Sequence, residues 1–359
     1  METSIKRRKT KAIYLGNVQI GGNAPVVVQS MTCTYTRDVK KTVNQIRMLE
    51  DAGCEVVRVA VPDEDAASAL KDIKRQINIP LIADIHFSYR LALAAMENGV
   101  DGIRINPGNI GREKIPEIVK SAKYHGTAIR IGINSGSLEK DLFVKYGGPS
   151  APALVESALR NLDHIRSTGF DNVKLSLKSS DVVTMIKAYR DISNRTDSPL
   201  HLGVTEAGSL VHAAIKSSIG MGILLYEGIG DTIRVSITGD PVSEIGVAYD
   251  ILRALSIRNV GPDIISCPTC GRCEINLFSL AQEVEKRLAG TKSYLKIALM
   301  GCVVNGPGEA MEADVGIAGG RGFGMLFKKG KVIKKVKEQD LITVLMDEIN
   351  AMITREKEA

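Results

Sequence analysis

The sequence is dominated by a regular alternation of short β-branched segments and longer helical patterns. Eight apolar segments follow one another between residues 26 and 238, and amphipathic stretches with apolar residues three and four positions apart separate them. The segments cover residues 26–32, 55–62, 80–86, 102–108, 128–134, 172–178, 199–208 and 232–238. Strand followed by helix, repeated eight times, is typical of a (β/α)8 TIM barrel. We therefore predict this α/β fold for residues 1–258.

The main competing fold is a doubly wound open sheet, which commonly binds nucleotides through glycine-rich loops. The chain contains neither G-x-G-x-x-G nor G-x-x-x-x-G-K-[ST], so the usual nucleotide loops of that fold are missing. The first helical stretch also has clear boundaries, with Asp38 as its expected N-cap and Gly53 as its stop signal.

The alternation ends near residue 258, and a different pattern follows. We expect a small α+β domain over residues 259–359, beginning after a boundary at residues 259–262. Its expected elements are a helix, a strand, a hairpin and a closing helix. They cover residues 278–290, 294–302, 324–336 (with a turn at Lys329-Gly330) and 339–353.

Charged and polar side chains recur where the predicted barrel strands end, and barrel enzymes carry their chemistry at these carboxyl ends. The set is Arg58, Asp84, His86, Arg104, Asn106, Arg130, Asn134, Lys178, Glu206 and Arg234. A single strand arginine is most often a structural ion pair, but five strands here supply cations and the acidic residues are too few to neutralise them. The pattern predicts a site for a phosphate or diphosphate. Glu206 is a candidate proton donor or acceptor, with an ion pair to one arginine as the simpler alternative.

Three cysteines with C-x2-C-x2-C spacing occur in the second domain, at Cys267, Cys270 and Cys273, and Cys302 follows in a glycine-rich stretch. Such thiols bind zinc or an iron–sulfur cluster, and their spacing alone does not choose between the two. The remaining two cysteines stand apart, and we expect them to pack in the core.

Seven strings occur in an order that resembles the bacterial 4-hydroxy-3-methylbut-2-enyl diphosphate synthases. They are GIRINPGN, IRIGIN, VKLSLK, LHLGVTEAG, EGIGDTIRVS, CPTCGR and GCVVNGPGEA, and they span roughly residues 26 to 320. The resemblance implies a TIM barrel joined to a reductase-like domain with a [4Fe-4S] cluster. It also implies an oxidoreductase of isoprenoid precursor biosynthesis that opens 2-C-methyl-D-erythritol 2,4-cyclodiphosphate and removes a hydroxyl as water. The two electrons would come singly from flavodoxin or ferredoxin.

The same resemblance assigns roles to particular residues. Cluster ligands would be Cys267, Cys270, Cys302 and Glu309, which leaves Cys273 as a bystander. The diphosphate would be bound by Arg58, Arg104, Arg130, Asn134 and Lys178, and Asn305 would contact the substrate. Glu206 would be the acid/base residue, with His86 and Arg234 as weaker candidates. Because cations and cluster lie in different domains, the resemblance further implies a head-to-tail homodimer.

Two other functions remain open from the residues alone. One is a sugar-phosphate isomerase or aldolase with a structural zinc, which explains the cations but gives the GPGE segment no role. The other is a zinc-ribbon protein for RNA, which the 4% aromatic residues and the lack of a dense Lys/Arg cluster beyond KRRKTK and KKGKVIKK support poorly. The basic N-terminus lacks the apolar stretch of a secretory signal, and no apolar run is long enough for a membrane span. We expect a cytoplasmic protein.

Overall fold

The computed structural model describes residues 5–302 and 311–358, and the chain divides into two compact units, residues 1–258 and 259–359. Asn305 and Glu309, two residues with expected roles, lie outside the described part of the chain. None of the described helices combines the length and the apolar composition that a membrane crossing requires.

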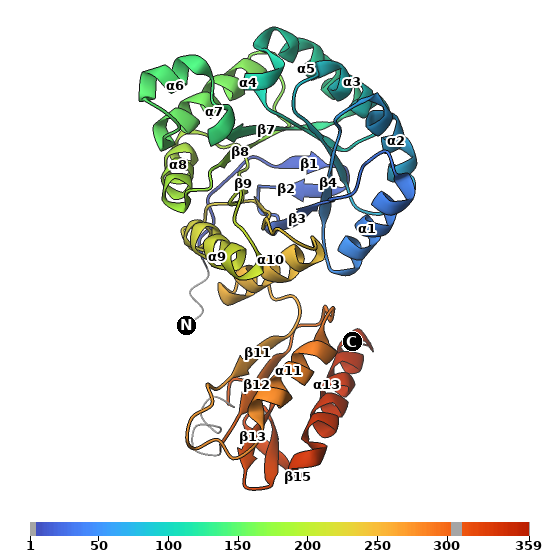
Figure 1. Ribbon diagram of the computed structural model, residues 1–359, viewed down its shortest axis with the longest axis vertical. Helices are drawn as coiled ribbons and strands as arrows, with labels where there is room; N and C mark the ends of the chain where they lie inside the picture. Colours follow the sequence, from blue (N-terminus) through green and yellow to red (C-terminus); the bar gives the residue numbers. More distant parts are fainter. Residues whose placement is uncertain (1–4, 303–310, 359) are drawn as a thin grey trace. The chain divides into compact units, whose positions relative to one another are not determined.

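The first unit is a barrel of eight parallel strands surrounded by helices, as the sequence predicts (Figure 1). Its strands are β3 (Val27–Met31), β4 (Val56–Ala60), β5 (Leu81–Ile85), β6 (Gly102–Ile105), β7 (Ala128–Asn134), β8 (Val173–Lys178), β9 (His201–Leu202) and β10 (Thr232–Ile233). Hydrogen-bonded neighbours run from β8 through β7, β6, β5, β4 and β3 to β10 and β9. A parallel bridge between Leu175 and Leu200 links β8 to β9 and closes the barrel.

Amphipathic helices connect the strands and bury their apolar faces against the sheet. They are α1 (Val39–Asp51), α2 (Glu64–Lys74), α3 (Tyr89–Glu97), α4 (Pro107–Ile110), α5 (Ile115–His125), α6 (Lys140–Tyr146), α7 (Ala151–Arg166), α8 (Val182–Arg195), α9 (Leu210–Tyr226) and α10 (Val242–Ala254). The predicted boundaries of α1 are confirmed: Asp38 accepts a hydrogen bond from the Lys41 N–H at 3.1 Å, and Gly53 has φ +99°.

Two strands are shorter than predicted. The segments at 199–208 and 232–238 give β9 and β10, each with two residues in the ladder. A side chain at Gly203 would place its Cβ 3.0 Å from Lys178 Nζ. The Lys178 side chain thus occupies the space beside Gly203. Beyond Leu202 the chain continues outside the ladder, at the mouth of the barrel.

An N-terminal hairpin of β1 (Ile13–Leu15) and β2 (Val18–Ile20) covers the end of the barrel where the strands begin. Its apolar residues pack on the first residues of the barrel strands. The cluster is Ile13, Leu15, Ile20, Val27, Val56, Ile82 and Ala128. Just before the hairpin, Arg7 Nη2 lies 3.1 Å from Asp231 Oδ1. The hairpin does not cover the opposite end, where the strands finish.

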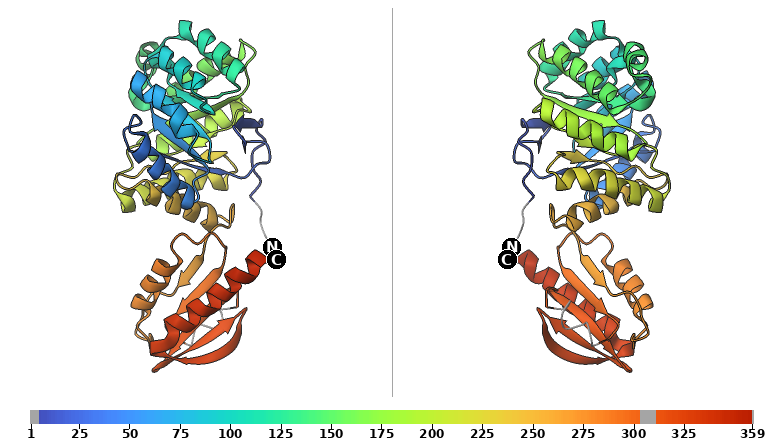
Figure 2. Two further views of the ribbon diagram at one scale, coloured as in Figure 1. Left: turned by 90° about the vertical axis from the view of Figure 1, so that its right-hand side faces the viewer. Right: turned by 90° about the vertical axis from the view of Figure 1, so that its left-hand side faces the viewer.

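The described residues of the second unit form a five-stranded sheet with two helices on one face (Figure 2). The strands lie in the order β11 (Asp263–Ser266), β12 (Lys296–Met300), β13 (Val315–Gly320), β14 (Phe323–Lys328) and β15 (Lys331–Lys337), and the helices are α11 (Leu277–Leu288) and α13 (Leu341–Glu358). The predicted hairpin is confirmed, with positive φ at Lys329 and Gly330. Sequence patterns missed β11 and β13, because β11 has four residues and β13 is rich in glycine.

Candidate functional site

Five cationic side chains from four strands are buried at and below the mouth of the barrel. They are Arg58 on β4, Arg104 on β6, Arg130 on β7, and Lys174 and Lys178 on β8. The half-buried Arg234 follows β10. Within the described residues, two buried carboxylates pair with this group, those of Asp84 and Glu244. The mouth therefore carries a large excess of positive charge.

Asp84 connects three of the predicted residues. Its carboxylate lies 3.5 Å from Arg58 Nε and accepts a bond of 3.1 Å from Arg104 Nη1. The same Arg104 nitrogen is 2.9 Å from His86 Nε2, which must be the acceptor because a guanidinium only donates. Burial alone would raise the pKa of Asp84, but the positive charges of Arg58 and Arg104 outweigh it and hold that pKa far below its usual value. Asp84 therefore stays ionised and fixes the two arginines.

Arg234 has a different environment. It donates to Glu244 Oε1 at 3.2 Å, and Glu244 also accepts bonds from Ser30 Oγ at 2.8 Å and the Ile237 N–H at 3.1 Å. Its charge is thus largely compensated inside the protein. This pairing makes Arg234 a structural residue of the mouth, consistent with its low rank among the predicted candidates.

Arg130 and the two lysines of β8 lack such compensation. Arg130 Nε and Nη1 and Lys174 Nζ are buried and form no hydrogen bond within residues 5–302 and 311–358. Burial and the neighbouring cations lower the pKa of Lys174 and of Lys178 well below the usual lysine value, and burial lowers the pKa of Arg58 to about 10. Uncompensated buried cations of this kind are a costly arrangement that an anionic ligand would relieve.

A pocket of about 340 Å³ opens above these cations. Its lining is polar: His86, Asn106, Asn109, Asn134, Ser135, Gly136, Ser137, Ser180, Thr205 and Glu206. With its amide oriented to satisfy both neighbours, Asn134 accepts a bond of 2.9 Å from Arg104. His86 and Asn134 thus join the pocket wall to the cations, and the volume suits a small ligand.

Glu206 lies at the rim of this pocket. Its side chain is exposed, its backbone has φ +54°, and no ion pair to it forms among the residues that the structure describes. A positive φ is unusual for glutamate and is often found at functional positions. The alternative of a structural ion pair to an arginine therefore finds no support in the described residues.

Sequence reasoning missed Lys174 and Glu244. Lys174 could have been found from the alternation in VKLSLK, because residues 174, 176 and 178 of one strand share a face. Glu244 gives no such signal, since it lies on α10 and reaches Arg234 only through the tertiary fold.

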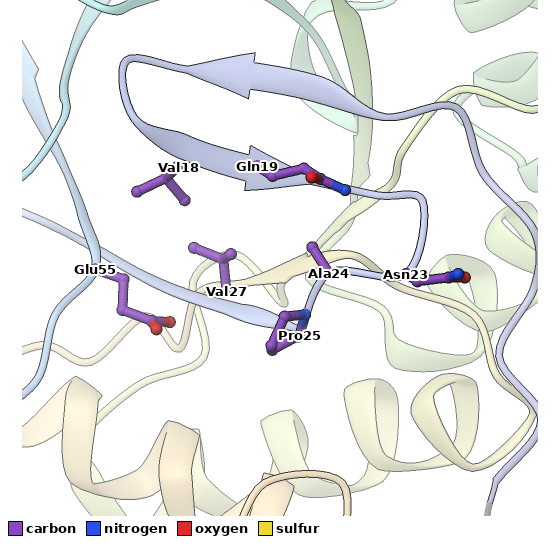
Figure 3. Close-up of a pocket in the computed structure, with 7 residues that line it drawn as sticks. All are labelled: Val18, Gln19, Asn23, Ala24, Pro25, Val27 and Glu55. Atoms are coloured by element: carbon purple, nitrogen blue, oxygen red, sulfur yellow. The ribbon is translucent and has the colours of Figure 1, made fainter.

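A larger hollow of about 490 Å³ lies at the other end of the barrel, beside the N-terminal hairpin (Figure 3). It is lined by Val18, Gln19, Asn23, Ala24, Pro25, Val27 and Glu55. The carboxylate of Glu55 is already bound, by the Val28 N–H at 2.8 Å and by Arg258 at 2.7 Å. This hollow therefore offers no reactive group, and the smaller pocket is the better candidate site despite its size.

The cysteines of the second unit gather at the ends of β11 and β12. The Gly301 N–H donates to Cys267 Sγ at 3.2 Å, and Cys302 follows directly. Gly301 also lies beside Cys273, because a Cβ built on it would be 2.5 Å from Cys273 Sγ. Cys273 donates its S–H to the Ile275 carbonyl at 3.2 Å, whereas Cys270 is exposed.

This arrangement fits a thiolate-bound iron–sulfur cluster. The described residues do not contain three cysteine, histidine or acidic side chains in a ligating arrangement, but Glu309 lies outside them. Cys267 Sγ accepts the N–H of the glycine that precedes Cys302, and thiolates are the ligands that such clusters require. Zinc binds the same thiols, so these ligands are compatible with either an iron–sulfur cluster or zinc.

Both units match one protein family. Residues 10–249 match the GcpE TIM-barrel domain and residues 263–351 the GcpE protein C-terminal domain. A protein of Lawsonia intracellularis is 58% identical over 97% of this chain and 97% of its own, and one of Nitratidesulfovibrio vulgaris is 55% identical over 99% and 92%. Both are named 4-hydroxy-3-methylbut-2-en-1-yl diphosphate synthase (flavodoxin).

Similarity to solved structures concerns the barrel. A type I 3-dehydroquinate dehydratase of Clostridium difficile superposes with a TM-score of 0.52 at 15% identity, covering 69% of this chain and 98% of its own. At this identity the likeness reports the fold alone.

Proposed function

The chain belongs to the GcpE family, and we propose on that premise that it is a 4-hydroxy-3-methylbut-2-en-1-yl diphosphate synthase of isoprenoid precursor biosynthesis. It converts 2-C-methyl-D-erythritol 2,4-cyclodiphosphate to (E)-4-hydroxy-3-methylbut-2-enyl diphosphate. The observation that carries this proposal is the pair of complementary features in one chain: uncompensated cations in the barrel mouth, and cysteines at the ends of β11 and β12 in the second unit. The sugar-phosphate isomerase alternative finds no support, since the family match includes the cysteine-bearing unit.

The buried cations bind the diphosphate. Arg58, Arg104, Arg130 and Lys178 provide charge, and Asn134 adds an amide in the pocket wall. Arginine binds phosphate oxygens through two N–H groups at once, which orients the group as well as attracting it. Because Asp84 fixes Arg58 and Arg104 before the ligand arrives, these side chains lose little conformational entropy when the ligand binds.

Glu206 is the acid/base residue. It lines the pocket above the proposed diphosphate site, and its carboxylate forms no ion pair with a cation among the described residues. Ring opening leaves a phosphate oxygen that remains an anion, whereas loss of the hydroxyl as water requires one proton on the hydroxyl oxygen. An unpaired carboxyl at the rim can take this proton from solvent and hand it on. The proposed second carboxylate, Glu309, and the proposed substrate contact, Asn305, are assigned from the family motif alone.

A [4Fe-4S] cluster bound by Cys267, Cys270, Cys302 and Glu309 would supply the two electrons of the reduction one at a time. The protein's own part is to keep these thiols together and reduced. Such thiols persist in the cytoplasm, where we place the protein. The relatives' printed names favour flavodoxin over ferredoxin as the electron donor.

One anaerobic experiment tests the function. The chain, reconstituted with iron and sulfide, should be brown, carry about four irons per chain, and convert the cyclic diphosphate to product with dithionite as reductant. A colourless protein with bound zinc, or a brown one that leaves the cyclic diphosphate unchanged, would contradict the proposal.

We also propose a head-to-tail homodimer, in which the small unit of one copy covers the barrel mouth of the other. Helix α9 supports a self-association surface, because Val211, Ile215, Ile219 and Ile223 recur every fourth residue and are exposed by 65%, 53%, 50% and 37%. Monomers rarely leave such a stripe open to water. In a two-fold symmetric dimer the same surface of both copies can meet, so this face of α9 can contact its counterpart in the second copy.

The surface can be tested by sedimentation. Ile215→Glu combined with Ile219→Glu should convert the dimer to monomers, because two buried charges on each side would oppose association. Val183→Glu on the exposed face of α8 is the control and should remain dimeric. A double variant that still sediments as a dimer would place the contact elsewhere.

A further inference from the structure

The β14–β15 hairpin of the second unit is strongly basic. Residues 328–337 include six lysines and no acidic residue. Lys328 pairs with Glu348, but within the described part of the chain no ion pair forms with Lys329, Lys331, Lys334, Lys335 or Lys337. Lys335 Nζ lies 3.9 Å from the centre of the Phe323 ring, and no acidic side chain of the described residues neutralises these five lysines.

The hairpin lies at one edge of the sheet and reaches the end where the thiols gather (Figure 1). Met300, Ala318, Met325 and Lys335 are successive partners across β12, β13, β14 and β15. At about 4.8 Å per strand, Lys335 is roughly 14 Å from the strand end that leads into Cys302. A protein bound along β15 would thus lie near the thiols.

Lysines on an edge strand have a simpler explanation, which is protection of that edge against pairing with another chain. That explanation does not account for Val332 and Ile333, which lie between the lysines and are exposed by 58% and 49%. Protection alone would favour polar residues at both positions. Exposed apolar side chains flanked along a strand by cations are instead typical of a contact surface for a charged protein.

We propose that the outer edge formed by β15 is the docking surface for an acidic, flavin-carrying electron-transfer protein. The inference rests on the proposed function, which needs electrons from such a carrier. Lysines steer a negatively charged partner toward the edge, and Val332 and Ile333 supply the short-range contact. The surface is distinct from the cationic barrel mouth, whose charges are buried and serve a small ligand.

The test compares two triple variants with the same change in net charge. Lys331→Glu, Lys334→Glu and Lys337→Glu alter the surface, whereas Lys71→Glu, Lys120→Glu and Lys187→Glu alter exposed positions on three barrel helices. Binding of FMN-loaded flavodoxin is measured by calorimetry at low and moderate salt, and turnover is measured with flavodoxin and, separately, with dithionite.

The β15 variant should bind flavodoxin at least about tenfold more weakly, with a reduced salt dependence. Its turnover with dithionite should equal that of the unaltered protein, and the barrel variant should match the unaltered protein in every measurement. Equal flavodoxin affinity in the two variants would overturn the docking surface. If the unaltered protein shows no turnover of the cyclic diphosphate with dithionite, the proposed function itself is refuted.

Discussion

Replacing Cys302 by serine should yield a colourless protein with less than one iron per chain, against about four in the unaltered protein. Cys302 follows Gly301, whose N–H is bonded to Cys267 Sγ, and we propose that both cysteines bind the same cluster. Serine offers a harder and less acidic oxygen, and iron–sulfur clusters are retained poorly by it. Iron analysis and the visible spectrum of the anaerobic protein provide the measurement, and product formation should be abolished.

Cys273→Ser is the matched control and should keep both the iron and the activity. Cys273 is also close to Gly301, but its Sγ lies 3.2 Å from the Ile275 carbonyl, a contact with a local structural role. A serine hydroxyl can make the same bond. The opposite result, in which Cys273→Ser loses iron and Cys302→Ser keeps it, would exchange the roles of the two cysteines.

Arg130→Met should weaken binding of the cyclic diphosphate by about 100-fold or more and, in the same protein, raise the melting temperature of the empty barrel by about 2 °C or more. The two effects share one cause. Arg130 is 2% exposed and leaves two of its nitrogens without a partner among the described residues, so its buried charge destabilises the empty protein. The ligand's phosphates would supply the missing partners. Calorimetric binding and thermal unfolding measure the two effects.

Arg234→Met provides the contrast at the same mouth. Arg234 is paired with Glu244, which is 2% exposed, so its removal leaves a buried carboxylate uncompensated. The melting temperature should therefore fall. If both arginine variants shift stability in the same direction, or if Arg130→Met leaves ligand affinity intact, the distinction between a ligand-binding and a structural arginine fails.

Much of the fold could be predicted from the sequence, because each barrel strand is a short β-branched segment between helical patterns. The hairpin at Lys329-Gly330 was equally predictable, since its turn residues adopt positive φ. Strand β13 was missed because its pairing depends on both neighbours and hardly on its own glycine-rich sequence. The lengths of β9 and β10 were overestimated, because the residues that follow each short ladder continue the apolar, β-branched pattern of a strand.

The candidate site was predicted as a set of residues, but the sequence could not rank them. Arg58, Arg104 and Arg234 have buried acidic partners, whereas Arg130 does not, and this difference arises from which side chains the closed barrel brings together. The partners Asp84 and Arg104 are on neighbouring strands, but Glu244 comes from a helix. Pairing between such distant elements leaves no local pattern in the sequence.

The contacts of the N-terminal segment also bear on how the chain is made. Arg7 and the β1–β2 hairpin leave the ribosome before the barrel strands do, yet Arg7 bonds to Asp231, 224 residues later, and the hairpin packs against the first residues of four strands. These partners emerge gradually during translation, so the segment with Arg7 and the hairpin cannot dock until most of the barrel has been synthesised. Its docking is then a closing step of barrel assembly, and nascent chains that stall before Asp231 emerges should keep this segment open to proteases and chaperones.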